Sequence, residues 1–223
     1  MEDIVLIGGG GHALSVADAI INGKHYEIVG YTDGSDTHIP LRYLGTDDIL
    51  KSLFEKGVMN AVITVGYLGK NSVRDRLYNM VKQAGFRLPK IIDPSAVVSS
   101  SADVGEGVFI GKYAVVNAEA KIERMCIINT GAIIEHNNQI GEYSHIAVGA
   151  TLCGNVHVGA HTFIGANATI IQGVQIGMNT IIGAGSVVIG DVPDNSRIVG
   201  VGGVFNFHFK RVSFRTNKDC EAA

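Results

Sequence analysis

Aliphatic residues recur at every sixth position through the second half of the chain. The series runs without a slip from Val98 to Val188 and fills sixteen consecutive hexads. A helix would need a period of about 3.6 and a half-buried strand a period of about 2, so neither element explains the spacing. Short strands separated by tight turns do explain it, because each aliphatic side chain then points into a narrow triangular coil. The pattern predicts a left-handed parallel β-helix of hexapeptide repeats, with three hexads per turn and about five turns.

The eighteen-residue turn converts sequence separation into position. Each turn stacks on the previous one at a spacing of about 4.8 Å, so residues eighteen apart share a column. This rule places Gly154 beside His136 and Ala184 beside Ala166.

The first ninety residues show a different pattern, in which apolar strands alternate with helices. Residues 2–7, 26–33 and 60–66 read as strands, and helices are expected after the first glycine cluster, at 46–57 and at about 70–84. Such alternation implies a small parallel sheet. We therefore expect three regions. They are a small Rossmann-like α/β domain at residues 1–90, the left-handed β-helix at 91–193 and a C-terminal extension at 194–223.

A glycine cluster follows the first strand. Residues 8–13 read GGGGHA, and Asp33 comes about twenty residues later, which fits a nucleotide-binding loop. A domain of about ninety residues offers only one mononucleotide-binding half, so a nucleotide sugar is favoured over a dinucleotide. Its diphosphate would lie on the backbone N–H groups at the helix start. The alternative for this loop is a purely structural turn. Asp33 could accept hydrogen bonds from a nucleobase or ribose, or it could be a turn residue at the end of a strand. Gly66 could border the same site or could likewise be only a turn residue.

Composition excludes several classes of protein. The formal net charge of −3 gives no electrostatic footprint for nucleic acid. The three cysteines form no CxxC pair or metal-ligand spacing, and free thiols fit a reducing, cytoplasmic location. Charged or turn residues interrupt every apolar run, so we expect no membrane span and no signal peptide.

The combined motifs resemble those of one family. A small α/β domain is followed by hexapeptide turns that carry NTGAIIEH at 129–136 and GNVHVG at 154–159. From about residue 3 to residue 192 this resembles the bacterial sugar acetyltransferases of the sialic-acid O-acetyltransferase and bacillosamine-pathway type. That family includes enzymes that N-acetylate nucleotide-linked 4-amino-4,6-dideoxy sugars. The resemblance implies a homotrimer that binds acetyl-CoA along the β-helix, between subunits, and the nucleotide sugar in the N-terminal domain.

The resemblance also implies roles for single residues. His136 matches the family's catalytic base, and Asn129 matches a residue near it that positions the substrate. His145 matches a histidine that contacts acetyl-CoA. The remaining residues implied for acetyl-CoA are Gly154, Ala166 and Ala184, and those implied for the nucleotide sugar are Gly10, Gly11 and His12, with Asp33 and Gly66 nearby.

The chain departs from the family pattern at two places. Relatives commonly have an acid after the catalytic histidine, where this chain has Asn137, and the usual ending after the last turn is replaced by GVGGVFNFHFKR at 200–211. The first departure leaves open what orients the histidine. The second leaves open how the adenine end of CoA is held.

The residue types suit acetyl transfer by direct attack of an acceptor on the thioester. Histidine can take the acceptor's proton because its ordinary pKa lies near neutrality. No covalent intermediate is needed, so Cys126 and Cys153 are not expected to be nucleophiles. A neutral amine is already nucleophilic, and the missing acid at position 137 therefore favours N-transfer over O-transfer.

Three alternatives remain open at this stage. The first is a sugar O-acetyltransferase of the sialic-acid type, and the second is a non-catalytic nucleotide-sugar-binding protein. The third is a trimeric zinc enzyme on the same scaffold, for which His157 and His161 are the only close histidine pair. The spacing of the histidines does not favour a metal site, and we expect none. His136, Asn129 and His145 also have plain interpretations as polar residues of the coil surface.

Overall fold

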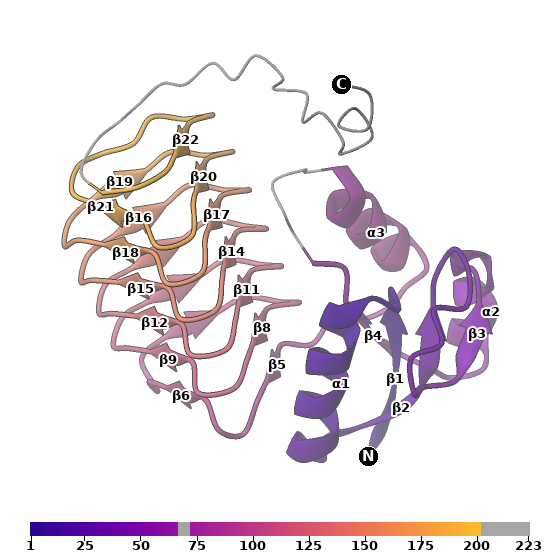
Figure 1. The fold of residues 1–223 in the computed structure, drawn as a ribbon. Helices are drawn as coiled ribbons and strands as arrows, with labels where there is room; N and C mark the ends of the chain where they lie inside the picture. Colours follow the sequence, from indigo (N-terminus) through magenta and orange to yellow (C-terminus); the bar gives the residue numbers. More distant parts are fainter. Residues whose placement is uncertain (67–71, 202–223) are drawn as a thin grey trace, which may run out of the picture.

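The computed structural model describes residues 1–66 and 72–201 of the 223-residue chain, and it contains two joined parts (Figure 1). The first is an α/β domain, whose elements are β1 (Glu2–Ile7), α1 (Gly11–Gly23), β2 (Tyr26–Thr32), β3 (Tyr43–Gly45), the 3₁₀ turn η1 (Asp47–Ile49), α2 (Leu50–Glu55), β4 (Asn60–Ile63) and α3 (Ser72–Gln83). The second part is the coil predicted from the hexads. The fold class is confirmed.

The four-stranded sheet of the α/β domain is parallel, in the order β3–β2–β1–β4. Residues 4–7 of the central strand β1 are buried on both faces, as expected for a parallel sheet between two helical layers. On one face, α1 packs through Ala13, Val16 and Ile20, and on the other, α2 and α3 pack together with Phe86.

The helices begin close to the predicted positions, with two differences. The segment expected to be one helix at 46–57 opens with the 3₁₀ turn η1 before α2. Thr46 occupies the cap position, but its hydroxyl donates to the Asp48 carboxylate at 3.0 Å and not to the backbone. The third helix, α3, begins at Ser72, and Lys70 lies outside the described residues.

The coil consists of two-residue strands that form three parallel sheets. The first coil sheet contains β5 (Ile91–Ile92), β8 (Phe109–Ile110), β11 (Ile127–Ile128), β14 (His145–Ile146), β17 (Phe163–Ile164), β20 (Ile181–Ile182) and β22 (Arg197–Ile198). The second contains β6 (Val97–Val98), β9 (Val115–Val116), β12 (Ile133–Ile134), β15 (Thr151–Leu152), β18 (Thr169–Ile170) and β21 (Val187–Val188). The third contains β7 (Asp103–Val104), β10 (Lys121–Ile122), β13 (Gln139–Ile140), β16 (His157–Val158) and β19 (Gln175–Ile176).

The second residue of each coil strand points inward, and the first points outward. Inward residues such as Ile134, Ile146 and Ile164 are fully buried in one continuous apolar core. Strands pair with the strand eighteen residues away, as Ile127 with His145 and Ile128 with Ile146, so the predicted columns exist. Ile91–Ile92 and Arg197–Ile198 extend the coil to about six turns, one more than the sixteen hexads predict.

Three corners per turn join the sheets. We call them the first corner (after the first coil sheet, as at 129–132), the second (as at 135–138) and the third (as at 141–144). Most of them contain a residue with positive φ, such as Gly131, Asn137 and Tyr143. Glycine and asparagine tolerate this left-handed conformation best, which explains the polar residues that interrupt the aliphatic repeat.

The α/β domain is fixed to the coil at two places. The outward side chains of Ile91, Phe109 and Ile127, in the first coil sheet, belong to the same apolar core as α1. At the third corner, the buried Arg74 of α3 donates to the carbonyl oxygens of Met125 and Tyr143, on successive turns. These two contacts hold the α/β domain against the coil.

Candidate active site

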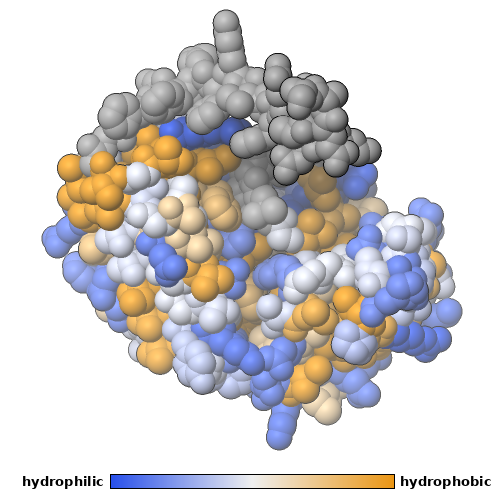
Figure 2. Space-filling model, viewed as in Figure 1, coloured by the Kyte–Doolittle hydropathy of each residue, from blue (hydrophilic) through white to orange (hydrophobic). Residues whose placement is uncertain are grey.

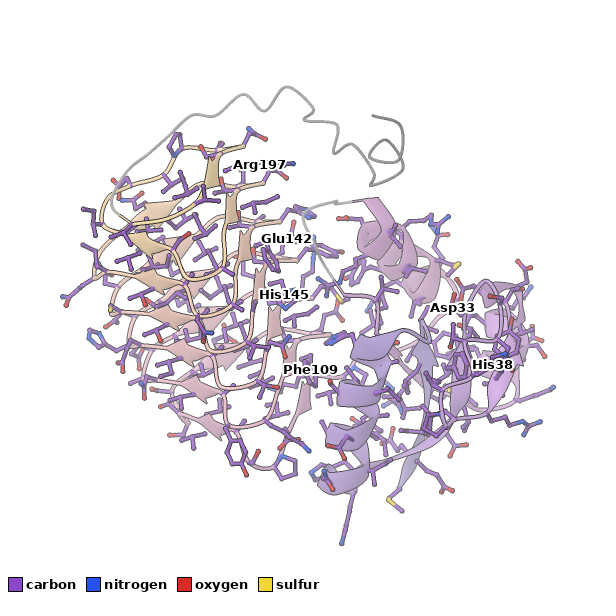
Figure 3. All side chains as sticks on the ribbon, in the orientation of Figure 1. Asp33, His38, Phe109, Glu142, His145 and Arg197 are labelled. Carbon is purple, nitrogen blue, oxygen red and sulfur yellow. The ribbon has the colours of Figure 1, made fainter. Side chains whose placement is uncertain are left out.

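A cleft of about 720 Å³ lies between the α/β domain and the coil. That volume falls within the range of small-molecule sites. Of the residues singled out from the sequence, seven line it, namely Gly10, Gly11, His12, Asp33 and Gly66 from the domain and Asn129 and His145 from the coil. Figure 3 shows His145 on the side of the coil that faces the domain.

The glycine loop opens the N-terminus of α1 to the cleft. Gly10 is extended and caps the helix without a side-chain hydrogen bond, and the first turn carries no acid. At the start of α1, the N–H of Ala13 donates to the carbonyl of Gly10 at 2.9 Å, whereas no partner within the described residues is found for the N–H groups of Gly11 and His12. A β-carbon on Gly10 or Gly11 would meet only open space, and both residues line the cleft, so a ligand has room beside this helix start. Such a helix start binds anions, phosphate above all.

Asp33 holds this loop in place. Its carboxylate accepts the backbone N–H of Gly9 at 2.7 Å and that of Gly34 at 2.6 Å. A β-carbon on Gly9 would lie 2.4 Å from the Tyr31 ring, so no larger residue fits there. The role of Asp33 toward a base or ribose stays a prediction, whereas its bond to the loop is a property of the fold.

His12 is an ionisable group of the cleft whose pKa departs far from its ordinary value. Burial, the neighbouring His145 and the Arg74 guanidinium lower the pKa of His12 to about 4. The ring meets Phe109 edge-on at 5.1 Å between centroids, and Gly66 lies against its β-carbon. The Nε2 atom is buried and has no hydrogen-bond partner within residues 1–66 and 72–201. A neutral imidazole with an unused nitrogen is therefore available to a ligand.

Asn129 and His145 line the same cleft as His12, from the coil side. The Asn129 Nδ2 atom lies 3.3 Å from His145 Nε2, and the Asn129 Oδ1 atom accepts the N–H of Thr130 at 2.8 Å. His145 is buried and meets the Phe163 ring edge-on. The geometry groups both residues with the glycine loop. The roles taken from the resemblance, Asn129 near the base and His145 on acetyl-CoA, stay predictions.

Other lining residues were not singled out from the sequence. Thr130 and Val148, eighteen residues apart, line the cleft beside Asn129, and Ser15 faces it from α1. Thr130 directly follows Asn129 in the chain, and the eighteen-residue rule then places Val148 beside Thr130. Arg74 gave no such signal, because its place depends on how α3 docks on the third corner.

His136 lies elsewhere on the molecule, at the second corner. Its side chain is exposed, and its Nδ1 atom lies 2.9 Å from Asn137 Oδ1. An amide oxygen only accepts, so Nδ1 is the donor in this contact, and in the neutral imidazole the lone pair is then on Nε2. Asn137 thus contacts the imidazole at the place where the resemblance implies an acid. Its positive φ of 59° also suits asparagine.

The predicted contact between His136 and Gly154 is confirmed. A β-carbon on Gly154 would lie 2.5 Å from His136 Nε2, so only glycine leaves the imidazole in its place. Among the described residues the neighbouring N–H groups are used, that of Cys153 by Ile170 and that of Asn155 by His136, whereas no partner is found for the Gly154 N–H. A free N–H therefore lies beside a free imidazole nitrogen.

The predicted site residues thus form two separate groups within one chain. The cleft lies beside the first corner, whereas His136 and Gly154 lie at the second corner, and the strand β12 separates Asn129 from His136. Ala166 stacks under Ala184 on the first corner, as the eighteen-residue rule predicts. The predicted acetyl-CoA residues are therefore divided between two corners.

Other reactive groups take no part. Burial raises the pKa of the Cys126 thiol to about 12, and the thiol donates to the Gly141 carbonyl inside the coil. No group of three metal-ligating side chains occurs in the described part of the chain. Among the same residues, no helix is long and apolar enough to cross a membrane.

Two protein-family models match the chain. Residues 3–81 match the PglD N-terminal domain, and residues 155–190 match the bacterial transferase hexapeptide, in six repeats. No curated protein sequence matches.

Solved structures match nearly the whole chain. PerB from Caulobacter crescentus, in complex with CoA and GDP-perosamine, is 36% identical, with a TM-score of 0.85 over 90% of this chain and 95% of PerB. The acetyltransferase domain of PglB from Neisseria gonorrhoeae, in complex with acetyl coenzyme A, is 33% identical, with a TM-score of 0.81 over 89% and 96%. WeeI from Acinetobacter baumannii shares the fold at 22% identity, with a TM-score of 0.77 over 90% and 97%.

The lowered pKa of His12 makes a prediction about stability. Because the unfolded histidine has a pKa of about 6.5, it binds a proton between pH 6.5 and about 4 while the folded one does not. The unfolded state then holds more protons, so stability falls as the pH falls. Between pH 7 and pH 5 this group should remove about 2 kcal/mol from the free energy of unfolding.

Urea unfolding at the two pH values measures the effect. His12→Gln should lose less stability than the wild type between pH 7 and pH 5. His25→Gln, at an exposed position, is the control and should behave as the wild type. Equal losses in all three proteins would show that His12 is not held neutral.

Proposed function

Because the chain belongs to the hexapeptide-repeat sugar acetyltransferases, we propose that it transfers the acetyl group of acetyl-CoA to the amine of a nucleotide-linked 4-amino-4,6-dideoxy sugar. Family membership rests on PerB, 36% identical over 95% of its length, and it agrees with the resemblance seen in the sequence. The single observation that carries the proposal is the cleft, which joins an anion-binding helix start to a coil of acetyltransferase type.

The acceptor binds in the cleft. Its diphosphate lies on the free N–H groups of Gly11 and His12, on the loop that Asp33 holds in shape. The sugar then lies against the coil wall of Asn129 and His145. The positive charge of Arg74 disfavours a second cation near His12, and it is one reason why His12 stays neutral. The cleft therefore favours the uncharged form of the acceptor amine.

His136 is the general base of the transfer. Its Nε2 lone pair takes the proton that the amine loses as nitrogen attacks the thioester carbon. The free N–H of Gly154, next to the imidazole, donates to the oxyanion that develops on the thioester oxygen. Nitrogen–carbon bond formation and release of the CoA thiolate complete the reaction without an acyl-enzyme.

A homotrimer brings the two groups together. The outward residues of the second coil sheet are mostly apolar, whereas those of the third are polar. The former are Val97, Val115, Ile133, Thr151, Thr169 and Val187, and the latter are Asp103, Lys121, Gln139, His157 and Gln175. Apolar surface also appears at the upper left edge of the coil (Figure 2), and at the second corner Ile171 and Ile189 are exposed. Such surfaces mark interfaces.

The position of this apolar sheet determines which corners of neighbouring subunits come together. It lies between the first corner, beside the cleft, and the second corner, which carries His136. If three copies pack these sheets around one axis, the second corner of each copy approaches the first corner of the next. Acetyl-CoA then lies between subunits, with Gly154 on one side and Ala166 and Ala184 on the other, and cyclic symmetry gives three equal sites.

The chemistry favours an amine over a hydroxyl acceptor. His136 is oriented by a neutral amide and not by a carboxylate, so this contact adds no negative charge to stabilise the protonated imidazole. An uncharged amine attacks with little help, whereas a hydroxyl needs strong deprotonation. The free thiols of Cys126 and Cys153 agree with a cytosolic enzyme, where acetyl-CoA is available.

A substrate comparison tests the proposed function. The enzyme is incubated with acetyl-CoA and with GDP- and UDP-linked 4-amino sugars, the corresponding hydroxy sugars, or sialic acid. Thiol release and product mass are then measured. We expect acetylation of an amino sugar only. Turnover of sialic acid alone would indicate the O-acetyltransferase, and no turnover of any acceptor would leave a binding protein.

Removing the base should lower turnover and leave binding intact. We expect His136→Ala to reduce kcat by about 10²- to 10⁴-fold, with little change in the affinity for CoA. Raising the pH should restore part of the rate, since solvent then deprotonates the amine. Asn137→Asp should keep or raise the rate, because a carboxylate can replace the amide oxygen at Nδ1.

A pair of glycine variants controls for changes in the coil. Gly154→Ala should reduce kcat because its β-carbon displaces the imidazole, whereas Gly190→Ala, two turns further along the same column, has open space and should not. A near-normal kcat in His136→Ala would return this histidine to the role of an exposed corner residue.

Mixed trimers test whether the site is shared between subunits. His136→Ala lacks the base, and Gly10→Trp fills the phosphate site. Either variant alone should be inactive. If one subunit supplies the base and its neighbour the cleft, every mixed trimer has one intact boundary. An equal mixture after refolding together should then recover about a quarter of wild-type activity.

Mass spectrometry of the intact assembly and sedimentation confirm that the subunits have mixed. No recovery in a fully mixed sample would place the base and the cleft of one site in the same chain. A monomer at micromolar concentration would contradict the trimer itself.

A further inference from the structure

Positive charge is scarce along the upper turns of the coil. Between Arg124 and Arg197 the sequence contains no lysine or arginine. Arg197 is the exposed, outward residue of β22, where it pairs with Ile181 of β20. Figure 3 shows it at the C-terminal end of the coil, on the side that carries His145. Arg197 is therefore the cation that this end of the coil offers to a ligand with several negative charges.

The charge of Arg197 is not used by the described part of the chain. Among residues 1–66 and 72–201 it forms no ion pair and no side-chain hydrogen bond. The two acids between Glu142 and Arg197 are engaged elsewhere. Asp191 accepts the N–H of Gln175, and Asp194 accepts that of Met178, each at 2.8 Å. The guanidinium is therefore free to bind an anion.

A neutral track leads from the cleft to this end of the coil. Val148 lines the cleft, and Ala166 and Ala184 follow in the same column of the first corner. Ile182 pairs with Ile198, which places Gly200 above Ala184, three residues after Arg197. Small, uncharged residues suit the uncharged pantetheine arm but cannot compensate phosphate charge.

The length of the track matches the arm. Successive pairs join His145 to Phe163, Phe163 to Ile181 and Ile181 to Arg197, so Arg197 lies three strand spacings, about 14 Å, above the cleft. From the thioester sulfur to the first phosphorus, CoA has about thirteen bonds. This equals roughly four extended residues, or about 15 Å. A thioester at the cleft therefore brings the phosphates to Arg197.

We infer that Arg197 binds the phosphate groups of acetyl-CoA, an assignment that rests on the proposed function. Its planar fork of N–H donors fits phosphate oxygens, and a charge-assisted bond of this kind is stronger than a neutral one. This residue supplies the charge at the end of the coil where the sequence departs from the usual family ending. The other cations near that end, Lys210, Arg211, Arg215 and Lys218, lie outside the described residues.

Full-length Arg197→Gln tests the assignment with two acetyl donors. One is acetyl-CoA, and the other is S-acetyl-pantetheine, which lacks the phosphates and the adenosine. We expect the variant to raise the KM for acetyl-CoA by about 10- to 100-fold. The KM for acetyl-pantetheine, the KM for the acceptor and kcat should not change. Arg197→Lys should restore part of the affinity. Lys121→Gln, an exposed cation of the third coil sheet, is the matched control and should behave as the wild type.

Calorimetric titration with CoA separates failure of this assignment from failure of the proposed function. Equal CoA affinity in the wild type and Arg197→Gln would overturn the role of Arg197 and leave the acetyltransferase intact. An equal loss for both acetyl donors would also overturn it, because the residue would then act through the shape of the coil. A wild-type protein that binds neither CoA nor acetyl-CoA would overturn both proposals.

Discussion

The inward stack of aliphatic side chains is the interaction on which the rest of this structure depends. Each turn adds three buried residues to one column-like core, and burial of such a side chain contributes about 1.5–3 kcal/mol. A one-residue slip would expose every inward side chain, so the register is fixed along the coil. Because the turn has a constant length, residues eighteen apart become neighbours. His136 over Gly154 and Ala184 over Ala166 follow directly from it.

The same register divides the outside of the coil into three faces of different chemistry. The first coil sheet holds the α/β domain through Ile91, Phe109 and Ile127, and higher up it carries His145 and Arg197. The second presents mostly valine, isoleucine and threonine, and the third presents charged and amide side chains. A single repeat thus determines where the domain docks, which face suits contact between copies and where the cleft lies. In this account, the catalytic arrangement is a property of the assembly.

The sequence predicted the coil almost completely, because the hexad pattern reports each inward residue separately. It also identified the glycine loop, whose residues line the cleft together with Asn129 and His145. It did not predict the grouping of His12 with those two residues or the buried Arg74, since both depend on how α1 and α3 pack against the coil. Asn137 stands where the resemblance implies an acid. The structure explains the asparagine by its positive φ and by its contact with His136, and neither can be read from a sequence motif.

The central claim is that the base of one subunit meets the acceptor held in the cleft of another. A crystal structure with CoA and a nucleotide-linked 4-amino sugar tests it most directly. The account predicts His136 Nε2 of one subunit at about 2.6–3.2 Å from the sugar amine, directly or through one water, with the diphosphate on the glycine loop of the neighbouring subunit. An amine bound far from every His136 in the assembly, or a base and a cleft that meet within one chain, would contradict it.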